Sequence, residues 1–362
     1  MLNASNRLIP LFGLCIHCSI DVAASSNDGG AGGGGAATQA GARDTGGFGS
    51  SGTEPSTSTG GPGPSCFAPS FDFDETIRPH TLIVAGDNAY VATQDQPVHK
   101  VIQADLTTGA SFILATPEEE VRDLAVFAGY VYIGEKTAVR RIPEGGGAAE
   151  FLADAENLSD LAVDESGVYW TESIAGGGLR YLPAGGGAVE QLPVWFELDP
   201  CYLSLSAQGV VILPYNLGPH DVTLVDASLG TSEVLATTLN LARYPFEHAG
   251  YVHWLDEPWE GAPGGISRVP SAGGAKEQVL PLEGRLPFHL SIHDGHYTIV
   301  SRIGTSDSDV LTGSLPIQDA PTLVVTATVP DYVGSAALND ALIVVAAGTN
   351  PKLRSYCRAD LP

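Results

Sequence analysis

The stretch Leu161-Ala-Val-Asp-Glu-Ser-Gly-Val-Tyr-Trp-Thr-Glu172 consists of two short apolar runs joined by a turn. The runs hold β-branched and aromatic residues, which are typical of strands, and the Glu-Ser-Gly between them is typical of a tight turn. Six further copies of this pattern lie between Arg78 and the end of the chain. The second run of each copy supplies one anchor residue, and the anchors are Tyr90, Tyr132, Tyr169, Val211, His253, Thr298 and Ile343.

Successive anchors are 42, 37, 42, 42, 45 and 45 residues apart. A period near 40–45 residues, made of four short strands, is the signature of a β-propeller blade. The sequence therefore predicts an all-β domain over 66–362, folded as a seven-bladed β-propeller. The alternative is a six-bladed propeller, because the fourth copy is weak in its second half and 199–245 could fold irregularly. The glycine triplets, such as Gly145–Gly147, are expected to be hairpin turns because a strand and not a helix follows them.

Closure of the ring requires a strand from each end of the chain. The last copy supplies only three strands, which end at Leu353–Cys357, whereas Phe71–Ile77 begins with strict alternation of aromatic and acidic residues. We expect Phe71–Ile77 to be the outer strand of the last blade, beside Leu353–Cys357. This pairing would bring Cys66 close to Cys357, and we predict a disulfide between them because disulfides persist in exported proteins. The state of the remaining thiol, Cys201, is left open.

The N-terminal 65 residues have two distinct compositions. Residues 1–24 contain Arg7, then an apolar stretch, then small residues, which together are typical of an export signal. Residues 25–65 are dominated by Gly, Ser, Thr, Ala and Pro and are expected to be a disordered linker. We therefore expect an exported protein that is held at a bacterial cell envelope or secreted. Whether Cys15 or Cys18 carries a lipid anchor stays open, and such an anchor would be the only expected contact with a membrane.

The chain is strongly acidic, with 17 Lys and Arg against 42 Asp and Glu and a formal net charge of −25. Phosphate backbones would repel such a chain, so nucleic acid is not an expected partner. The charge is consistent with a soluble exported protein, which we expect to be a monomer.

The Tyr169-Trp-Thr-Glu172 sequence resembles the Tyr-Trp-Thr-Asp repeat of a propeller family, and such repeats are common in exported bacterial proteins. Tyr132-Ile-Gly-Glu135 and His253-Trp-Leu-Asp256 are degenerate versions in register with it. The resemblance covers the repeat region and implies the fold. It carries over no catalytic residue.

Propeller ligands usually bind over the central channel, at the face where the innermost strands begin. Proline stands eleven residues before three of the anchors, which supports this register: Pro79, Pro200 and Pro287. We expect the residues near these starts, together with the longer loops, to form the binding face. The candidate ligand-binding residues are Tyr202, Glu247, His248, Trp259 and His289.

The favoured function is a non-enzymatic binding module for a protein, peptide or glycan, with no cofactor. No Gly-x-Ser-x-Gly elbow, His-Glu-x-x-His helix or nucleotide fingerprint occurs in the sequence. The alternative is a metal-assisted hydrolase or lyase of the lactonase and lyase propeller type. In that alternative a divalent cation would be bound jointly by Asp123, Asp160, Glu247 and His289.

Overall fold

The computed structural model describes residues 70–72, 79–93, 98–174, 177–195, 200–214, 220–226, 228, 230–238, 241–258, 263–293, 295–303, 307–317, 322–328, 333–339, 342–347 and 352–357. Every regular element in this part of the chain is a β-strand. None of the described residues belongs to a helix that is long and apolar enough to cross a membrane.

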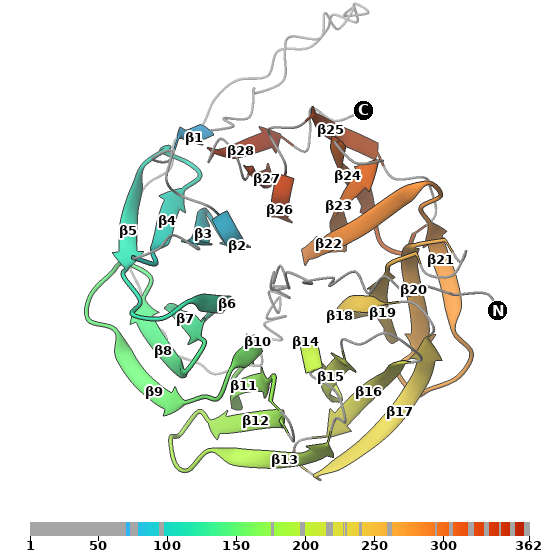
Figure 1. Ribbon diagram of the computed structural model, residues 1–362, viewed down its shortest axis with the longest axis horizontal. Coiled ribbons are helices and arrows are strands. Elements are labelled where there is room, and N and C mark those ends of the chain that lie inside the picture. Colours follow the sequence, from blue (N-terminus) through green and yellow to red (C-terminus); the bar gives the residue numbers. More distant parts are fainter. Residues whose placement is uncertain are drawn as a thin grey trace, which may run out of the picture. The chain divides into compact units, whose positions relative to one another are not determined.

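The strands form seven four-stranded antiparallel sheets, which we number as blades 1 to 7 (Figure 1). Blade 1 consists of β2 (Pro79–Ala85), β3 (Asn88–Thr93), β4 (Val101–Asp105) and β5 (Ser111–Ala115). Blade 2 consists of β6 (Val121–Phe127), β7 (Tyr130–Glu135), β8 (Ala138–Pro143) and β9 (Glu150–Asp154). Blade 3 consists of β10 (Leu158–Val163), β11 (Gly167–Glu172), β12 (Gly178–Pro183) and β13 (Glu190–Trp195). Blade 4 consists of β14 (Pro200–Ser206), β15 (Gly209–Pro214), β16 (His220–Asp226) and β17 (Thr231–Thr238).

Blade 5 consists of β18 (Ala242–His248), β19 (Tyr251–Asp256), β20 (Gly265–Pro270) and β21 (Glu277–Pro281). Blade 6 consists of β22 (Arg285–His293), β23 (His296–Ile303), β24 (Asp307–Ser314) and β25 (Thr322–Thr328). Blade 7 consists of β26 (Val333–Leu338), β27 (Leu342–Ala347), β28 (Lys352–Cys357) and β1 (Ser70–Asp72). The innermost strands of consecutive blades contact one another around the ring, and β26 contacts β2. The prediction of an all-β propeller is confirmed, and 199–245 contains the four strands of blade 4.

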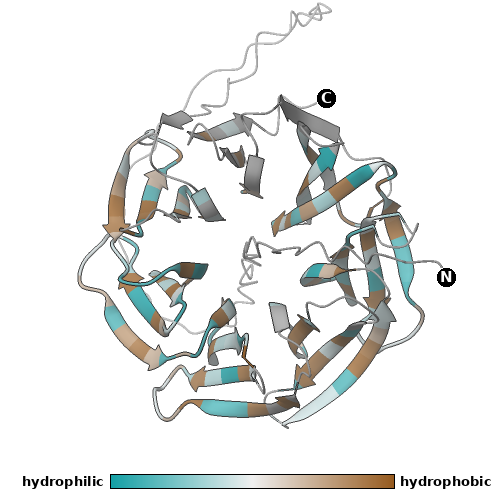
Figure 2. Cartoon of the chain, in the orientation of Figure 1, coloured by the Kyte–Doolittle hydropathy of each residue, from teal (hydrophilic) through white to brown (hydrophobic). Residues whose placement is uncertain are grey.

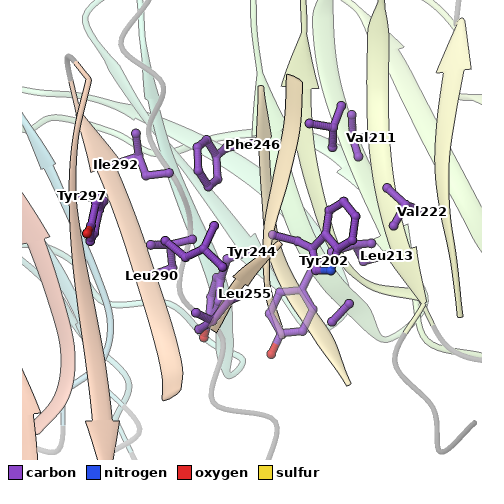
Figure 3. Packing of buried hydrophobic residues seen from close by; sticks show 14 of the residues in the cluster. Tyr202, Val211, Leu213, Val222, Tyr244, Phe246, Leu255, Leu290, Ile292 and Tyr297 are labelled. Carbon is purple, nitrogen blue, oxygen red and sulfur yellow. The ribbon is translucent and has the colours of Figure 1, made fainter. Parts of the chain in front are cut away.

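The core lies between blades, because the sheets bury apolar side chains on both of their faces. Figure 2 shows hydrophobic segments on the coloured strands. Trp170 and Trp254 are fully buried on the second strands of blades 3 and 5. The largest cluster draws on blades 4, 5 and 6, and Figure 3 shows part of it. A sheet buried on both faces explains why the second strand of each copy reads as a nearly continuous apolar run.

The predicted hairpin turns are confirmed in three blades. The N–H groups of Gly146, Gly186 and Gly273 donate to the carbonyl oxygens of Pro143, Pro183 and Pro270 at 2.8, 2.9 and 2.8 Å. The three glycines have φ angles of 87°, 77° and 79°, which lie in the left-handed region that favours glycine. The repeated Pro-x-x-Gly sequence is therefore required by one turn geometry.

The ring closes as the sequence predicts, through a strand from the start of the domain. β1 pairs antiparallel with β28, with Phe71 opposite Leu353. The strand is shorter than expected, since it spans Ser70–Asp72, and 73–78 lies outside the described residues. A second closing contact joins blades 7 and 1, where the Asn339 side-chain amide donates to the Gly86 carbonyl oxygen at 2.9 Å. Cys66 and the Cys357 side chain are not described, so their disulfide stays a prediction.

Candidate functional site

The seven innermost strands run from a face that we call the mouth face, where each begins, to a turn face, where each turns into the second strand. A register shift occurs near the start of each of these strands. The residue at this shift is either the second of the two paired residues that the shift separates or a residue between them. It takes an equivalent place in each blade. We call these residues the inner row, and its members with described side chains are Thr81, Asp123, Asp160, Tyr202, Tyr244 and His289.

Four members of the inner row form a hydrogen bond with the backbone of the next blade. The Thr81 hydroxyl donates to the Arg122 carbonyl oxygen at 3.4 Å. Asp123 Oδ2 accepts the Leu161 N–H at 2.8 Å, and Asp160 Oδ2 accepts the Leu203 N–H at 2.7 Å. His289 Nδ1 accepts the Ala336 N–H at 3.4 Å. These polar side chains therefore tie neighbouring blades together near the mouth face.

Asp123 and Asp160 form a pair of buried carboxyl groups between blades 2 and 3. Burial raises the pKa of Asp123 well above its usual value, and the charge of Asp160 raises it further. Burial also raises the pKa of Asp160, to about 6, although hydrogen bonds from Asp123 and from the Leu203 and Leu161 N–H groups oppose this. Two adjacent carboxylates repel each other, so the pair retains a proton to a higher pH than isolated carboxyl groups do.

Three members of the inner row are aromatic, and one of them is His289, which also forms a hydrogen bond to the next blade. The ring of Tyr244 lies 4.8 Å from that of Tyr202 and 5.1 Å from that of His289, measured between centroids. Figure 3 shows Tyr202 and Tyr244 within the cluster, with their hydroxyl groups on the same side. Burial lowers the pKa of His289 to about 3, and an Nδ1 atom that accepts a hydrogen bond requires a neutral ring. His289 is therefore uncharged near neutral pH, where it packs against Tyr244 and accepts a hydrogen bond from blade 7.

The structure separates the predicted ligand-binding residues. Tyr202 and His289 belong to the inner row, but Glu247 and His248 lie at the end of β18, at the turn face. Glu247 Oε2 accepts the Ala207 N–H at 2.7 Å, which joins the turn face of blade 5 to that of blade 4. Trp259 lies outside the described residues. The expectation of one shared face is wrong for Glu247 and His248, because five or more residues of extended chain separate them from the start of the strand.

The residues that stand at the mouth face in blade 5 are Arg243 and Tyr244, which the sequence analysis did not name. Three innermost strands have a proline eleven residues before their anchor. The same count back from the anchor His253 reaches Ala242, so it would also have located Arg243 and Tyr244. Arg243 is buried and forms a salt bridge of 2.6 Å with Glu257. Burial raises the pKa of Glu257, and the Arg243 guanidinium lowers it.

The four residues of the predicted cation site do not converge on one centre. Asp123 and Asp160 are adjacent, but their oxygens accept backbone N–H groups, and Glu247 is at the opposite face. Within the part of the chain that the structure describes, no group of three His, Cys, Asp or Glu side chains is arranged to hold a metal ion.

Glu172, the acid of the Tyr-Trp-Thr-Glu sequence, joins blade 3 to the connection that leads into it from blade 2. Glu172 Oε1 accepts the Trp170 indole N–H at 3.3 Å and the Glu156 N–H at 3.1 Å, and Arg180 donates to Glu172 Oε2 at 2.8 Å. In blade 5, Asp256 likewise accepts the Trp254 indole N–H, at 2.8 Å. The acid satisfies buried donors, which explains its recurrence without a role in chemistry.

A pocket of about 870 Å³ lies between blades 3 and 4 at the turn face. It is lined by the β10–β11 turn, the β14–β15 turn and the β16–β17 hairpin, and by Tyr169 and Leu224. Among the described residues that line it there is no Lys, Arg or His, and four are carboxylates: Asp164, Glu165, Asp226 and Glu233. Asp164 and Asp226 also shape the turns, because each accepts backbone N–H groups of its own turn. The exposed carboxylates of Glu165 and Glu233 form no salt bridge with any described residue.

No family model matches the chain, and no curated protein matches it. Solved structures with a similar fold include a catalytically inactive virginiamycin B lyase from Staphylococcus aureus with quinupristin, at 12% identity and a TM-score of 0.59, covering 80% of this chain and 98% of that one. The WD40 propeller domain of Doa1 is similar at 11% identity and a TM-score of 0.59, covering 79% and 95%. A puromycin-hydrolysing peptidase of Mycobacterium tuberculosis is similar at 16% identity and a TM-score of 0.57, covering 76% of this chain and 49% of that one. At these identities the similarities show a shared propeller fold, which occurs in enzymes and in interaction domains alike.

Proposed function

We propose that this protein is a non-enzymatic interaction module that binds a protein, peptide or glycan carrying positive charge. The observation that carries the proposal is the pocket between blades 3 and 4, a recess of about 870 Å³ whose described lining contains four carboxylates and no basic side chain. A recess with one sign of charge raises the local concentration of ligands of opposite charge and fixes their orientation.

The inner row supports this proposal because it acts as a frame. Asp123, Asp160 and His289, three of the four residues of the enzyme alternative, bond to the neighbouring blade rather than to a common centre. Glu247 similarly joins blades 4 and 5 at the turn face, close to the pocket residue Ala207. Such ties hold the pocket walls in fixed positions, and a fixed pocket loses little entropy on binding.

Charge reversal in the pocket tests the proposal. The double variant Glu165→Lys/Glu233→Lys should bind a fluorescent hexalysine peptide at least about tenfold more weakly, which corresponds to about 1.4 kcal/mol. Fluorescence anisotropy at about 0.15 M salt is the appropriate measurement, because screening at this ionic strength suppresses contributions from distant charges.

The matched control is Glu156→Lys/Glu283→Lys, which changes the net charge equally at two exposed positions outside the pocket. The control should retain nearly the affinity of the unmodified protein. Equal weakening of both double variants would show that only the overall charge of −25 attracts the peptide, and the pocket proposal would fail. A glycan array with both variants would then show whether a sugar occupies the pocket instead.

We further propose that the protein is exported and held at the cell envelope through 25–65. The support is the sequence of the first 65 residues, in which an apolar stretch precedes a Gly-, Ser- and Thr-rich segment. Fractionation after expression in a bacterial host should recover the protein in the envelope fraction. Recovery only from the cytoplasm would contradict export, whereas release into the medium would contradict retention alone.

A further inference from the structure

The outer strands of four consecutive blades carry glutamate at one equivalent position. This position is found by following the pairing register outward from each anchor, through the third strand to the fourth. The residues reached in blades 2 to 5 are Glu150, Glu190, Glu233 and Glu277. In blade 1 the same path runs from Tyr90 through Gln103 to Phe112. Blade 1 therefore has a phenyl ring where its four neighbours in sequence have a carboxylate.

The glutamates protect the edges of the blades. Glu150 forms a salt bridge of 2.8 Å with Arg141 on β8, and Glu277 forms one of 2.9 Å with Arg268 on β20. Charged side chains on an edge strand discourage pairing with a strand of another molecule. In blade 1 Gln103 instead donates a hydrogen bond to Asn88, at 3.0 Å, and leaves Phe112 without a polar partner.

β5 is consequently an apolar edge strand. Phe112 is 47% exposed and Ile113 is 53% exposed, and the strand contains neither a charged residue nor a proline. β5 is at the end of its sheet, so it has another strand on one side only. In Figure 2 β5 ranges from white to brown, whereas β9 and β21 contain teal segments.

A groove of about 320 Å³ lies beside β5, between blades 1 and 2. Leu114, Ile133 and Ile142 line it but are themselves almost fully buried, and Pro117 and Glu118 also belong to its lining. Arg140 also lines the groove, but its guanidinium is bound to Glu135 at 3.0 Å.

Free negative charge borders this groove. Glu118 and Glu119 are exposed, and neither forms a salt bridge with a described residue, whereas Glu120 is paired with Arg122 at 3.1 Å. The two carboxylates are close enough to the groove to raise the pKa of Glu135, although burial is the larger cause. A cation placed here by a partner would meet uncompensated carboxylates.

We propose that β5 and the adjacent groove bind an extended segment of another protein in which apolar residues alternate with lysine or arginine. The segment would add to the free edge of β5, place its apolar side chains on the face of Phe112, beside the groove, and direct its cations toward Glu118 and Glu119. Addition of a strand to an open edge gives affinity through backbone hydrogen bonds and selectivity through alternate side chains. This surface belongs to blades 1 and 2 and is independent of the pocket between blades 3 and 4.

The test uses the full-length protein and a fluorescent eight-residue peptide of alternating valine and lysine. Phe112→Glu restores the residue of blades 2 to 5 and should weaken binding at least about tenfold. Ile113→Lys is a second variant, which remains informative if Phe112→Glu fails to fold. Val189→Glu is the matched control, because Val189 is an exposed valine just before β13, on blade 3, and gains the same charge.

The expected result is weakened binding for the two β5 variants and unchanged binding for Val189→Glu, with an octalysine peptide bound more weakly than the valine–lysine peptide. Unchanged affinity of both β5 variants would overturn the proposal, and so would equal binding of octalysine. Sedimentation analysis supplies the third arm. A dimer that Phe112→Glu dissociates would also overturn the proposal, since the occupant would then be a second copy of this chain.

Discussion

At the scale of single residues, the paired carboxyl groups Asp123 and Asp160 make stability depend on pH. The pKa of Asp160 is raised from 3.8 to about 6 in the folded protein, so the folded state binds a proton more tightly than the unfolded state. The stabilising effect is complete below pH 3.8 and is lost as the pH rises through about 6. A difference of about two pH units corresponds to about 3 kcal/mol in the free energy of unfolding.

The variant Asp160→Asn should remove the part of this dependence that belongs to Asp160 and leave the part that comes from the burial of Asp123. Its amide oxygen can accept the Leu203 N–H, and Asp123 Oδ2 still accepts the Leu161 N–H, although the NH₂ group replaces the Asp160 oxygen that also accepted the Leu161 N–H. Urea unfolding between about pH 4 and pH 7 should therefore show a flatter stability curve than that of the unmodified protein. Asp160→Ala should be less stable throughout by about 1–3 kcal/mol, because the buried Leu203 N–H loses its acceptor.

Asp105→Asn is the matched control for this series. Asp105 is exposed, and its pKa is lowered to about 2, chiefly by the Thr107 hydroxyl. Its stabilising effect is present above pH 3.8 and is lost as the pH falls through about 2, so this variant should leave the window between pH 4 and 7 unchanged. A stability curve that Asp160→Asn leaves as steep as before would show that the pair does not titrate in this window.

At the scale of elements, β1 completes the last blade with only three residues. Removal of residues 1–72 should lower the midpoint of thermal unfolding by about 3 °C or more relative to removal of residues 1–69. The longer deletion exposes the edge of β28, which includes the fully buried Leu353 opposite Phe71. Differential scanning calorimetry of the two truncated proteins measures the difference, and equal midpoints would mean that three residues of pairing do not stabilise the blade.

The strands were predictable where the signal lies within one blade. The apolar runs and the turn chemistry around Gly167, together with the Pro-x-x-Gly hairpins, determine local structure, and both agree with the fold. The end of the propeller at which a residue lies was less predictable. Arg243 and Glu247 belong to one strand, but Arg243 is at the mouth face and Glu247 is at the turn face. Partners that join blades, such as Asp160 with Leu203, depend on the angle between sheets, which no periodicity in the sequence specifies.

At the scale of the whole molecule, seven sheets depend on one another through contacts between neighbours. The inner row ties blades 1 to 2, 2 to 3, 3 to 4 and 6 to 7, and the Asn339 amide ties blade 7 to blade 1. Blades 4, 5 and 6 share the largest apolar cluster instead. The period of the sequence predicted the number of repeats. Only the structure shows which neighbouring blades are joined by polar hydrogen bonds and which by packing of aromatic and other apolar side chains.

The position of β1 has a consequence for how the chain folds as it is made. A ribosome releases β1 before every other described strand and β28 after them, so blade 7 cannot be assembled until β28 has emerged. Until then β1 lacks the strand with which it pairs, and the growing propeller has two open sides. Domains generally fold from the N-terminus as they emerge, but the ring of this one closes only after six blades have been synthesised.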